Sequence, residues 1–279
     1  SEVRSRKYAS PFPLPPSFLM CRPTYYTIAY EINPWMRLTR RTVHRVALHQ
    51  WQQLYHFLNH RLRVRVQMVR PVRGLPDLVF TANAGLVVGR NLIRSNFRFP
   101  ERQGEEAVVE RYFRGRGYRV ARLPRGFNFE GEGDALWIGS TVLLGFRFRS
   151  DAAVHERLSR LLQREVLPVE LVDKRFYHLD TCFCPLGKTS ALWYPKAFDR
   201  YGRRVIESRV QELIEVSKMD ALQFCCNSIV IGQDLVMPAG VSQKLRQTLE
   251  TRGLAVHEVE LSEFIKAGGA AKCLVLRLA

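Results

Sequence analysis

Apolar residues recur along the chain in one repeating order: two short runs, an amphipathic stretch and a third short run. The paired runs at residues 84–93 and 135–144 are rich in Leu, Val and Ile, as β-strands are. Each pair leads into apolar residues at helical spacing, and a short strand-like run closes the unit. Helices are predicted at residues 105–113, 154–165, 204–213 and 242–252, and closing strands at residues 118–122, 167–171 and 254–259.

The amino-terminal part of the chain supplies a fifth unit of the same kind. Residues 27–32 are strand-like, residues 41–58 have the apolar pattern of a helix, and residues 62–69 form another strand-like run. The first strand of this unit is expected from the other end of the chain, at residues 274–278. The two ends of the chain would then meet in one sheet.

One polar position marks the start of each unit, and these positions follow one another at intervals of roughly 45 to 50 residues, a spacing typical of repeated supersecondary units. They are Asn83, Glu130, His178, Asn227 and Cys273. Five ββαβ units that close on themselves form an α/β propeller with pseudo-fivefold symmetry, in which these side chains project into a central channel. We predict one such domain over residues 1–279, with residues 1–17 as an extended arm. The alternative is an ordinary α/β sheet with these residues on unrelated loops.

Composition excludes several classes of protein. With 279 residues and 46% hydrophobic residues, the chain can bury a substantial core, which excludes intrinsic disorder. Six cysteines without a CxxC pair predict reduced, buried thiols rather than a disulfide framework or a metal site. No membrane span or signal peptide is recognisable, so the cytoplasm is the expected compartment and no membrane partner is predicted.

The chain is strongly basic, with a formal net charge of +17. Such a charge favours anionic partners, including nucleic acid. The basic residues are scattered and form no polybasic tail, so we expect only incidental affinity for nucleic acid.

Cys273 lies in a turn of small residues, Ala267-Gly-Gly-Ala-Ala-Lys-Cys273. Residues without bulky side chains let the backbone approach a ligand closely. A thiol presented there beside a lysine is placed as a nucleophile is, although a plain buried thiol is the alternative.

Seven short motifs are far more specific in their order than any one of them alone. They are Met20-Cys-Arg-Pro23, Tyr30-Glu-Ile-Asn-Pro-Trp-Met36, Thr81-Ala-Asn-Ala-Gly85, Pro100-Glu-Arg-Gln-Gly104, Phe129-Glu-Gly-Glu-Gly-Asp134, His178-Leu-Asp180 and Gly268-Gly-Ala-Ala-Lys-Cys273. In this order they resemble the pentein, or guanidine-modifying, superfamily of arginine deiminases, dimethylarginine dimethylaminohydrolases and amidinotransferases. The resemblance covers nearly the whole chain and is closest to the arginine dihydrolases.

The chemistry of guanidine hydrolysis suits these residues. Resonance makes the guanidinium carbon a poor electrophile, so attack needs a thiolate, which Cys273 supplies. His178 fits the general acid that protonates departing ammonia and the base that then activates water. Glu130 and Asp180 fit carboxylates that hold the planar cation. Because the whole chain is basic, the site itself must be acidic to bind a cation.

The resemblance implies further roles and a substrate. Asn83 stands where deiminases place an aspartate, which favours an arginine dihydrolase that releases ornithine, carbon dioxide and two ammonia molecules. Arg102 would pair with the α-carboxylate of L-arginine, Asn33 would contact the substrate, and Asp134 would be a site carboxylate or a support for the Gly-rich turn. No cofactor is predicted.

Other functions stay open. Arginine deiminase, which yields citrulline, and dimethylarginine hydrolysis use the same chemistry. A non-catalytic pentein that binds RNA or a ribosome through its basic surface is the alternative from another class. A homo-oligomer is possible.

Overall fold

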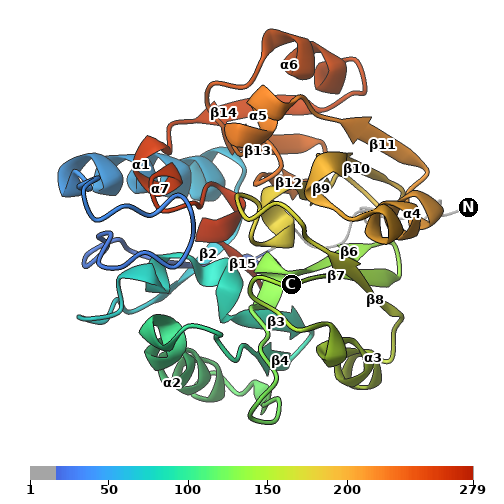
Figure 1. Cartoon of the computed structure of the whole chain (residues 1–279). Helices are drawn as coiled ribbons and strands as arrows, with labels where there is room; N and C mark the ends of the chain where they lie inside the picture. Colours follow the sequence, from blue (N-terminus) through green and yellow to red (C-terminus); the bar gives the residue numbers. More distant parts are fainter. Residues whose placement is uncertain (1–16, 279) are drawn as a thin grey trace, which may run out of the picture.

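Five three-stranded sheets surround a common axis in the computed structural model, which describes residues 17–278 (Figure 1). Every sheet pairs its first two strands antiparallel and its last two parallel. The blades are β3 (Gly85–Val88), β4 (Asn91–Arg94) and β5 (Arg119–Ala121); β6 (Ala135–Ile138), β7 (Thr141–Phe146) and β8 (Val166–Glu170); β9 (Phe183–Pro185), β10 (Ser190–Trp193) and β11 (Glu212–Glu215); β12 (Ile229–Ile231), β13 (Asp234–Pro238) and β14 (Ala255–Val259); and β15 (Leu276–Arg277), β1 (Ser17–Cys21) and β2 (Arg65–Val69).

One helix connects the second and third strands of each blade, and these helices lie on the outside of the ring (Figure 1). They are α2 (Pro100–Arg114), α3 (His155–Leu162), α4 (Arg200–Arg209), α6 (Gln243–Glu250) and α1 (His44–His56). Two shorter helices, α5 (Lys218–Leu222) and α7 (Ser262–Ile265), precede the last two blades along the chain. The prediction of a five-bladed α/β propeller of ββαβ units is confirmed.

The two ends of the described chain close the ring within one sheet. Strand β15 pairs antiparallel with β1, and β1 pairs parallel with β2. The prediction that residues 27–32 form a strand was wrong: the second strand of this blade is Ser17–Cys21, whose residues are almost all buried. Residues 27–32 instead belong to an irregular segment that connects β1 to α1. The arm predicted for residues 1–17 lies outside the described residues, except for Ser17.

Helix boundaries depart from the apolar pattern where capping residues act. Helix α2 begins at Pro100, five residues before the predicted start, because proline is well accommodated in the first turn. Asp199 caps α4 by accepting hydrogen bonds from the N–H groups of Tyr201 and Gly202. That helix ends at Arg209, not at residue 213, since the following residues form β11.

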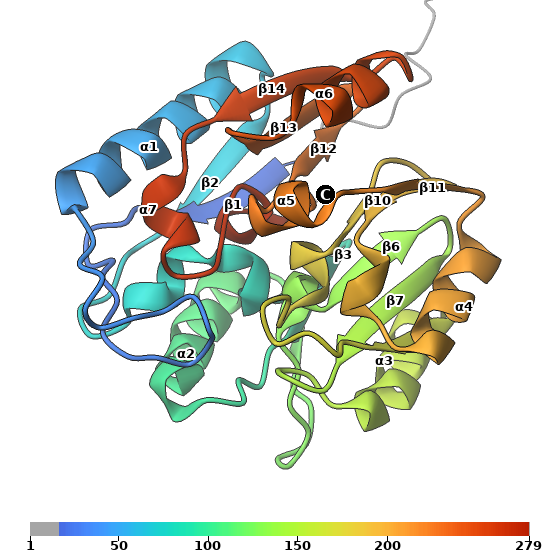
Figure 2. The ribbon, with the colours of Figure 1, turned by 45° about the horizontal axis from the view of Figure 1, so that its top comes forward.

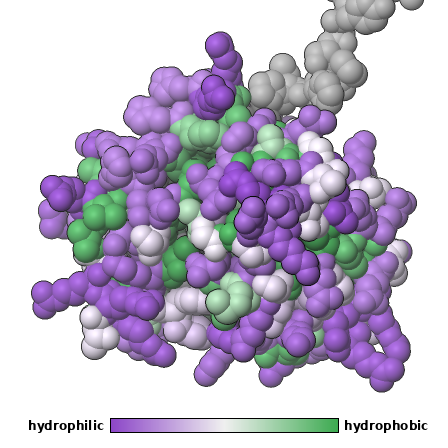
Figure 3. All heavy atoms as spheres, turned by 90° about the horizontal axis from the view of Figure 1, so that it is seen from above, coloured by the Kyte–Doolittle hydropathy of each residue, from purple (hydrophilic) through white to green (hydrophobic). Residues whose placement is uncertain are grey.

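Apolar side chains fill the layer between each helix and its sheet. Phe113 and Val109 of α2, for example, pack with Leu92 of β4, and all three are buried. The face seen in Figure 3 is mainly hydrophilic, with apolar residues in separate patches. None of the helices in residues 17–278 combines the length and apolar composition that a bilayer crossing requires.

The first strand of each blade is the one nearest the axis (Figures 1 and 2). A short turn precedes each of these strands, and four of the turns are single 3₁₀ turns that contact one another around the axis. These four are Thr81–Ala84, Gly131–Gly133, Leu179–Thr181 and Lys272–Leu274. The fold therefore gathers five segments about 50 residues apart in sequence around one point.

Candidate active site

Cys273 lies in the 3₁₀ turn Lys272–Leu274, and its side chain is buried. The two glycines before this turn, Gly268 and Gly269, leave little room for other residues. A Cβ atom on Gly269 would lie 2.5 Å from the ring of Phe80, and Gly268 has a φ of +83°, which favours glycine. Burial, followed by the nearby Asp180 carboxylate, raises the pKa of the Cys273 thiol well above its ordinary value. The thiol is therefore neutral before a ligand binds.

Asn227 fixes the position of this thiol. Its Nδ2 atom lies 3.1 Å from Sγ of Cys273, and its Oδ1 accepts hydrogen bonds from the backbone N–H groups of Cys273 and Ala270. Asn227 is fully buried. The sequence analysis included Asn227 among the five regularly spaced positions but assigned it no role. The spacing was the only feature of the sequence that pointed to this residue.

Asp180 faces the thiol directly. Its Oδ2 lies 3.4 Å from Sγ of Cys273, while its Oδ1 has no hydrogen-bond partner among residues 17–278. Burial raises the pKa of Asp180 to about 7, against the lowering effect of Lys272. Asp180 thus presents one free carboxylate oxygen beside the sulfur, as a cation-binding group must.

Glu130 joins His178 to a buried arginine that sequence analysis missed. Oε2 of Glu130 lies 2.8 Å from Nε2 of His178 and 2.9 Å from Nη1 of Arg149. Oε1 accepts a further hydrogen bond from the backbone of Arg98. Both oxygens are engaged, and these contacts orient His178. The role of Glu130 as a guanidinium clamp stays a prediction.

The protonation of this pair follows from its surroundings. Although burial opposes ionisation of Glu130, Arg149 and the hydrogen bond with His178 hold its pKa well below its ordinary value. Burial lowers the pKa of His178 to about 4. A neutral imidazole beside an ionised carboxylate donates its Nε2–H, which leaves Nδ1 as an acceptor. Nδ1 has no partner among the described residues, so it is the available basic atom.

Asn83 is held by Arg102. The Arg102 guanidinium donates to Oδ1 of Asn83 at 2.8 Å, and it also pairs with both carboxylate oxygens of Glu105 and with the backbone oxygen of Asp77. Because Oδ1 accepts from Arg102, the amide nitrogen of Asn83 is turned the other way and has no partner among residues 17–278. These contacts hold the Asn83 amide in place, and the pairing of Arg102 with a substrate carboxylate stays a prediction.

The unpartnered Nδ2 of Asn83 and Nδ1 of His178 both lie next to Gly133. A Cβ atom on Gly133 would lie 2.2 Å from Nδ2 of Asn83 and 3.3 Å from Nδ1 of His178. One oxygen of Asp77 is likewise buried without a partner, and burial raises the pKa of this carboxyl. Buried polar groups without partners are rare in proteins and need an explanation. Here four of them belong to one cluster of titratable and amide side chains: Asp77, Asn83, His178 and Asp180.

Asn33 and Asp134 have structural contacts. Asn33 accepts hydrogen bonds from the backbone of Trp35 and Met36 and donates to the oxygen of Ala267, so it ties the irregular segment to the cysteine turn. Asp134 accepts from Ser150 at 2.6 Å and from the backbone of Leu179 at 3.2 Å. Burial raises the pKa of Asp134 well above its ordinary value. Of its two predicted roles, these contacts favour support of the site.

The irregular segment covers the site from one side. Nη2 of Arg149 donates to the oxygen of Ile32, and the indole of Trp35 donates to the oxygen of Arg175. A depression of about 440 Å³ opens there, with Asn33, Arg149 and Tyr177 in its wall. Arg149 in this wall is ion-paired with Glu130 at 2.9 Å.

The basic residues next to the motifs, Lys272 and Arg22, do not place an unpaired charge at the Cys273 thiol: one is ion-paired and the other is exposed elsewhere. Lys272 donates to Glu132 at 2.8 Å, and this ion pair holds its pKa above the ordinary value although burial opposes it. Arg22 is exposed and lines a separate hollow beside Trp51 and Met68. Within residues 17–278 no three His, Cys, Asp or Glu side chains are arranged to hold a metal ion.

The model of one protein family, described as N,N dimethylarginine dimethylhydrolase, eukaryotic, matches residues 24–279. The chain belongs to this family. Its matched region contains every site residue named above. Within the dimethylarginine dimethylhydrolase family, the chain is 36% identical to the N(G),N(G)-dimethylarginine dimethylaminohydrolase of Mycobacterium tuberculosis, over 99% of this chain and 86% of that protein.

Relatives with arginine dihydrolase activity in their names are more similar still. The chain is 46% identical over 269 residues to the bifunctional arginine dihydrolase/ornithine cyclodeaminase of Nostoc sp.. The aligned region covers 94% of this chain and 37% of that protein. The chain thus spans little more than a third of the length of this relative. The solved N-terminal domain of ArgZ, an arginine dihydrolase from the ornithine-ammonia cycle in cyanobacteria, superposes in its substrate-bound form with a TM-score of 0.91 and 42% identity. That match covers 95% of this chain and 98% of the other, and it confirms the pentein fold.

Proposed function

We propose that this chain is an arginine dihydrolase, which converts L-arginine and two water molecules into ornithine, carbon dioxide and two ammonia molecules. The observation that carries the proposal is the set of unpartnered buried atoms on Asp77, Asn83, His178 and Asp180, in a cluster that includes the Cys273 thiol. This set offers carboxylate oxygens for a cation, a basic nitrogen and an amide donor. The 46% identity to a bifunctional arginine dihydrolase supports the choice of substrate.

Substrate binding would activate the nucleophile. A guanidinium group paired with Asp180 places positive charge beside Sγ of Cys273, and an adjacent cation lowers the pKa of a thiol. The neutral Nδ1 of His178 then takes the thiol proton. Attack of sulfur on the guanidinium carbon forms a C–S bond, and the imidazolium returns the proton to the departing amine. One ammonia leaves, and a thiouronium adduct stays on Cys273.

Water completes the first half of the reaction. His178 is neutral again after the first step, so it can remove a proton from water that attacks the adduct carbon. Collapse of this adduct releases sulfur and would give citrulline if the product left. A dihydrolase holds the ureido group and repeats the cycle at the same carbon, which yields ornithine, carbon dioxide and the second ammonia.

Asn83 favours retention of the neutral ureido group. Its free Nδ2 is a hydrogen-bond donor turned toward His178, and a donor suits the ureido oxygen or an attacking water. An aspartate here would present only acceptors when ionised. Arg102 fixes this orientation, which assigns it to positioning of Asn83.

Dimethylarginine hydrolysis is the second candidate, because the family model and the relative from Mycobacterium tuberculosis carry that name. The two are distinguished by kcat/KM for L-arginine and for asymmetric dimethylarginine in the same preparation. We expect arginine to be preferred at least tenfold and to yield ornithine. Preference for the methylated substrate with release of dimethylamine would reverse the assignment, and turnover of neither would point to the non-catalytic alternative.

A further inference from the structure

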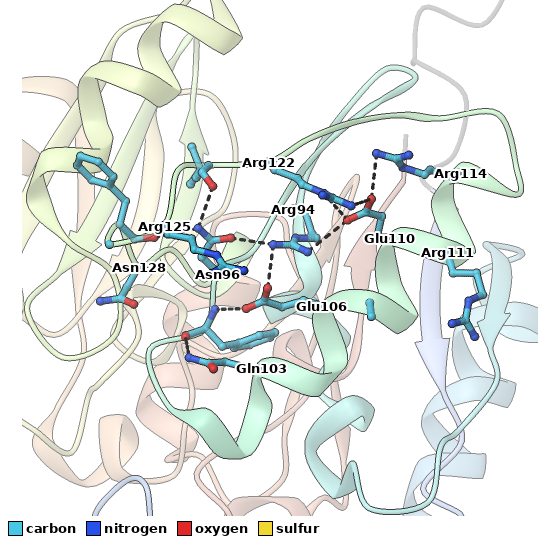
Figure 4. A pocket seen from close by; sticks show the side chains of 15 residues that line it. Arg94, Asn96, Gln103, Glu106, Glu110, Arg111, Arg114, Arg122, Arg125 and Asn128 are labelled. Atoms are coloured by element: carbon cyan, nitrogen blue, oxygen red, sulfur yellow. Dashed lines mark hydrogen bonds and ion pairs between the residues drawn. The ribbon is translucent and has the colours of Figure 1, made fainter.

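Another cavity is lined by residues 94–128, and Cys273 is not among its lining residues (Figure 4). Its volume is about 990 Å³, at the upper end of the range for small-molecule sites. One wall is helix α2, and the opposite wall is the segment 122–128 that follows β5. None of the residues proposed above for catalysis lines it.

Arginine dominates the wall of this cavity. Five arginines line it against two glutamates, which leaves an excess of three positive charges: Arg94, Arg111, Arg114, Arg122 and Arg125 against Glu106 and Glu110. Guanidinium groups bind phosphate through paired hydrogen bonds, and their charge attracts polyanions. The cavity therefore concentrates part of the net charge of +17 in one place.

Both glutamates are occupied by contacts that hold the arginines in place. Glu110 accepts from Arg94 at 3.2 Å, Arg114 at 2.9 Å and Arg122 at 2.8 Å (Figure 4). Glu106 pairs with Arg94 at 2.8 Å. Each arginine has five N–H donors, so these contacts leave donors of Arg114 and Arg122 free, and both side chains are more than half exposed. Fixed donors lose less entropy when a ligand binds.

Further donors in the wall have no partner. No hydrogen bond or ion pair joins the side chains of Arg111 and Arg125 to residues 17–278, and Nε of Arg94 is buried without an acceptor. Arg125 lines the same cavity as Asn96 and Arg94. Nδ2 of Asn96 contacts the oxygens of Leu123, Pro124 and Phe127, which fixes the segment that carries Arg122 and Arg125.

We propose that this cavity binds a small molecule bearing at least two phosphate groups. A single phosphate would neutralise only part of the excess charge and fill only a fraction of the volume. Phe127 adds an aromatic side chain to the wall. The site is independent of the proposed hydrolase activity.

Calorimetric titration of the full chain with inorganic pyrophosphate, and separately with ATP, tests the proposal. Arg125→Glu and Arg111→Glu change unpaired, exposed side chains, so the fold should survive. Arg204→Glu on α4 is the matched control, since Arg204 is exposed and unpaired within the described chain and does not line the cavity. We expect the dissociation constant of both probes to rise at least tenfold in Arg125→Glu and less than twofold in Arg204→Glu. Unchanged melting temperatures would confirm that each variant is folded.

Three outcomes would overturn the proposal. Absence of binding at millimolar probe concentration would show that the cavity takes no such ligand. An equal effect of Arg125→Glu and Arg204→Glu would show that net charge alone attracts the probes. Binding of a short single-stranded RNA with loss in Arg125→Glu, where pyrophosphate and ATP do not bind, would assign the cavity to nucleic acid instead.

Discussion

The amide nitrogen of Asn227 lies 3.1 Å from the sulfur of Cys273, and the oxygen of the same amide accepts the backbone N–H of that cysteine. One buried side chain thus both places the thiol and offers it a hydrogen bond. A donor to sulfur stabilises the thiolate more than the thiol. Asn227 is therefore proposed to position the nucleophile and to ease its ionisation.

Replacing this donor should make Cys273 less reactive. In Asn227→Asp the amide N–H is lost and a carboxylate faces the sulfur, so the thiol pKa should rise further. We expect iodoacetamide to alkylate Cys273 at least tenfold more slowly at pH 8, measured by mass spectrometry of the peptide that contains it. A hydrogen bond to a charged group is worth about 1.5–3 kcal/mol, which corresponds to such a factor. The exposed Asn91→Asp is the matched control, and an unchanged rate in Asn227→Asp would refute the role.

The pKa of Asp180, about 7, should govern substrate capture. The carboxylate binds a guanidinium only when ionised, and the ionised fraction falls as pH drops below the pKa. We predict that kcat/KM for L-arginine, which reports the free enzyme, is constant above pH 8 and falls about tenfold per pH unit below pH 6. His178 has a pKa of about 4, so it does not produce this step. A profile that stays flat to pH 5.5, or an Asp180→Asn variant with the same step, would contradict the assignment.

Asn83→Asp should shift the products toward citrulline. The new carboxylate would still accept the hydrogen bond from Arg102 but would turn an acceptor toward the site. A cationic guanidinium then binds better than a neutral ureido group. We expect the ratio of citrulline to ornithine, measured by amino-acid chromatography, to rise at least tenfold. Ornithine as the main product of this variant would show that Asn83 does not separate the two reactions.

Gly133 should tolerate no side chain. The added methyl group of Gly133→Ala would overlap Nδ2 of Asn83 at 2.2 Å. Overpacking costs about 1–3 kcal/mol and displaces neighbours, so we predict a kcat at least 100-fold lower with a melting temperature lower by several degrees. Gly187→Ala is the control, because its nearest atom, Oγ of Ser190, would lie at 3.5 Å. Equal activities of the two variants would place the reacting groups elsewhere.

The sequence predicted the propeller because five blades repeat one order of elements and one polar position each. It misplaced one strand for a local reason. Residues 17–21 follow a proline-rich stretch and do not alternate between apolar and polar, whereas residues 27–32 resemble a strand. Only the pairing of β1 with β15 and β2, which joins distant segments, decides between them.

The positions of five candidate site residues follow from their motifs, whereas those of their partners do not. Cys273, His178, Glu130, Asp180 and Asn83 lie in or beside the turns around the axis, since their motifs precede first strands. Their roles stay a prediction. Arg149 and Asp77 were missed because a single arginine among 43 basic residues, or an aspartate beside a proline, carries no local signal. The inward contacts of Arg102 depend on Glu105 and Asn83, which only the folded chain brings together. A homo-oligomer stays a prediction.

The ratio of ammonia released to L-arginine consumed tests the central claim most directly. Purified protein and a Cys273→Ser variant are incubated with L-arginine, and ammonia, ornithine and citrulline are quantified over time. The account predicts two ammonia molecules and one ornithine for each arginine, and no turnover in Cys273→Ser. One ammonia molecule with citrulline as the end product, or equal turnover by the Cys273→Ser variant, would contradict it.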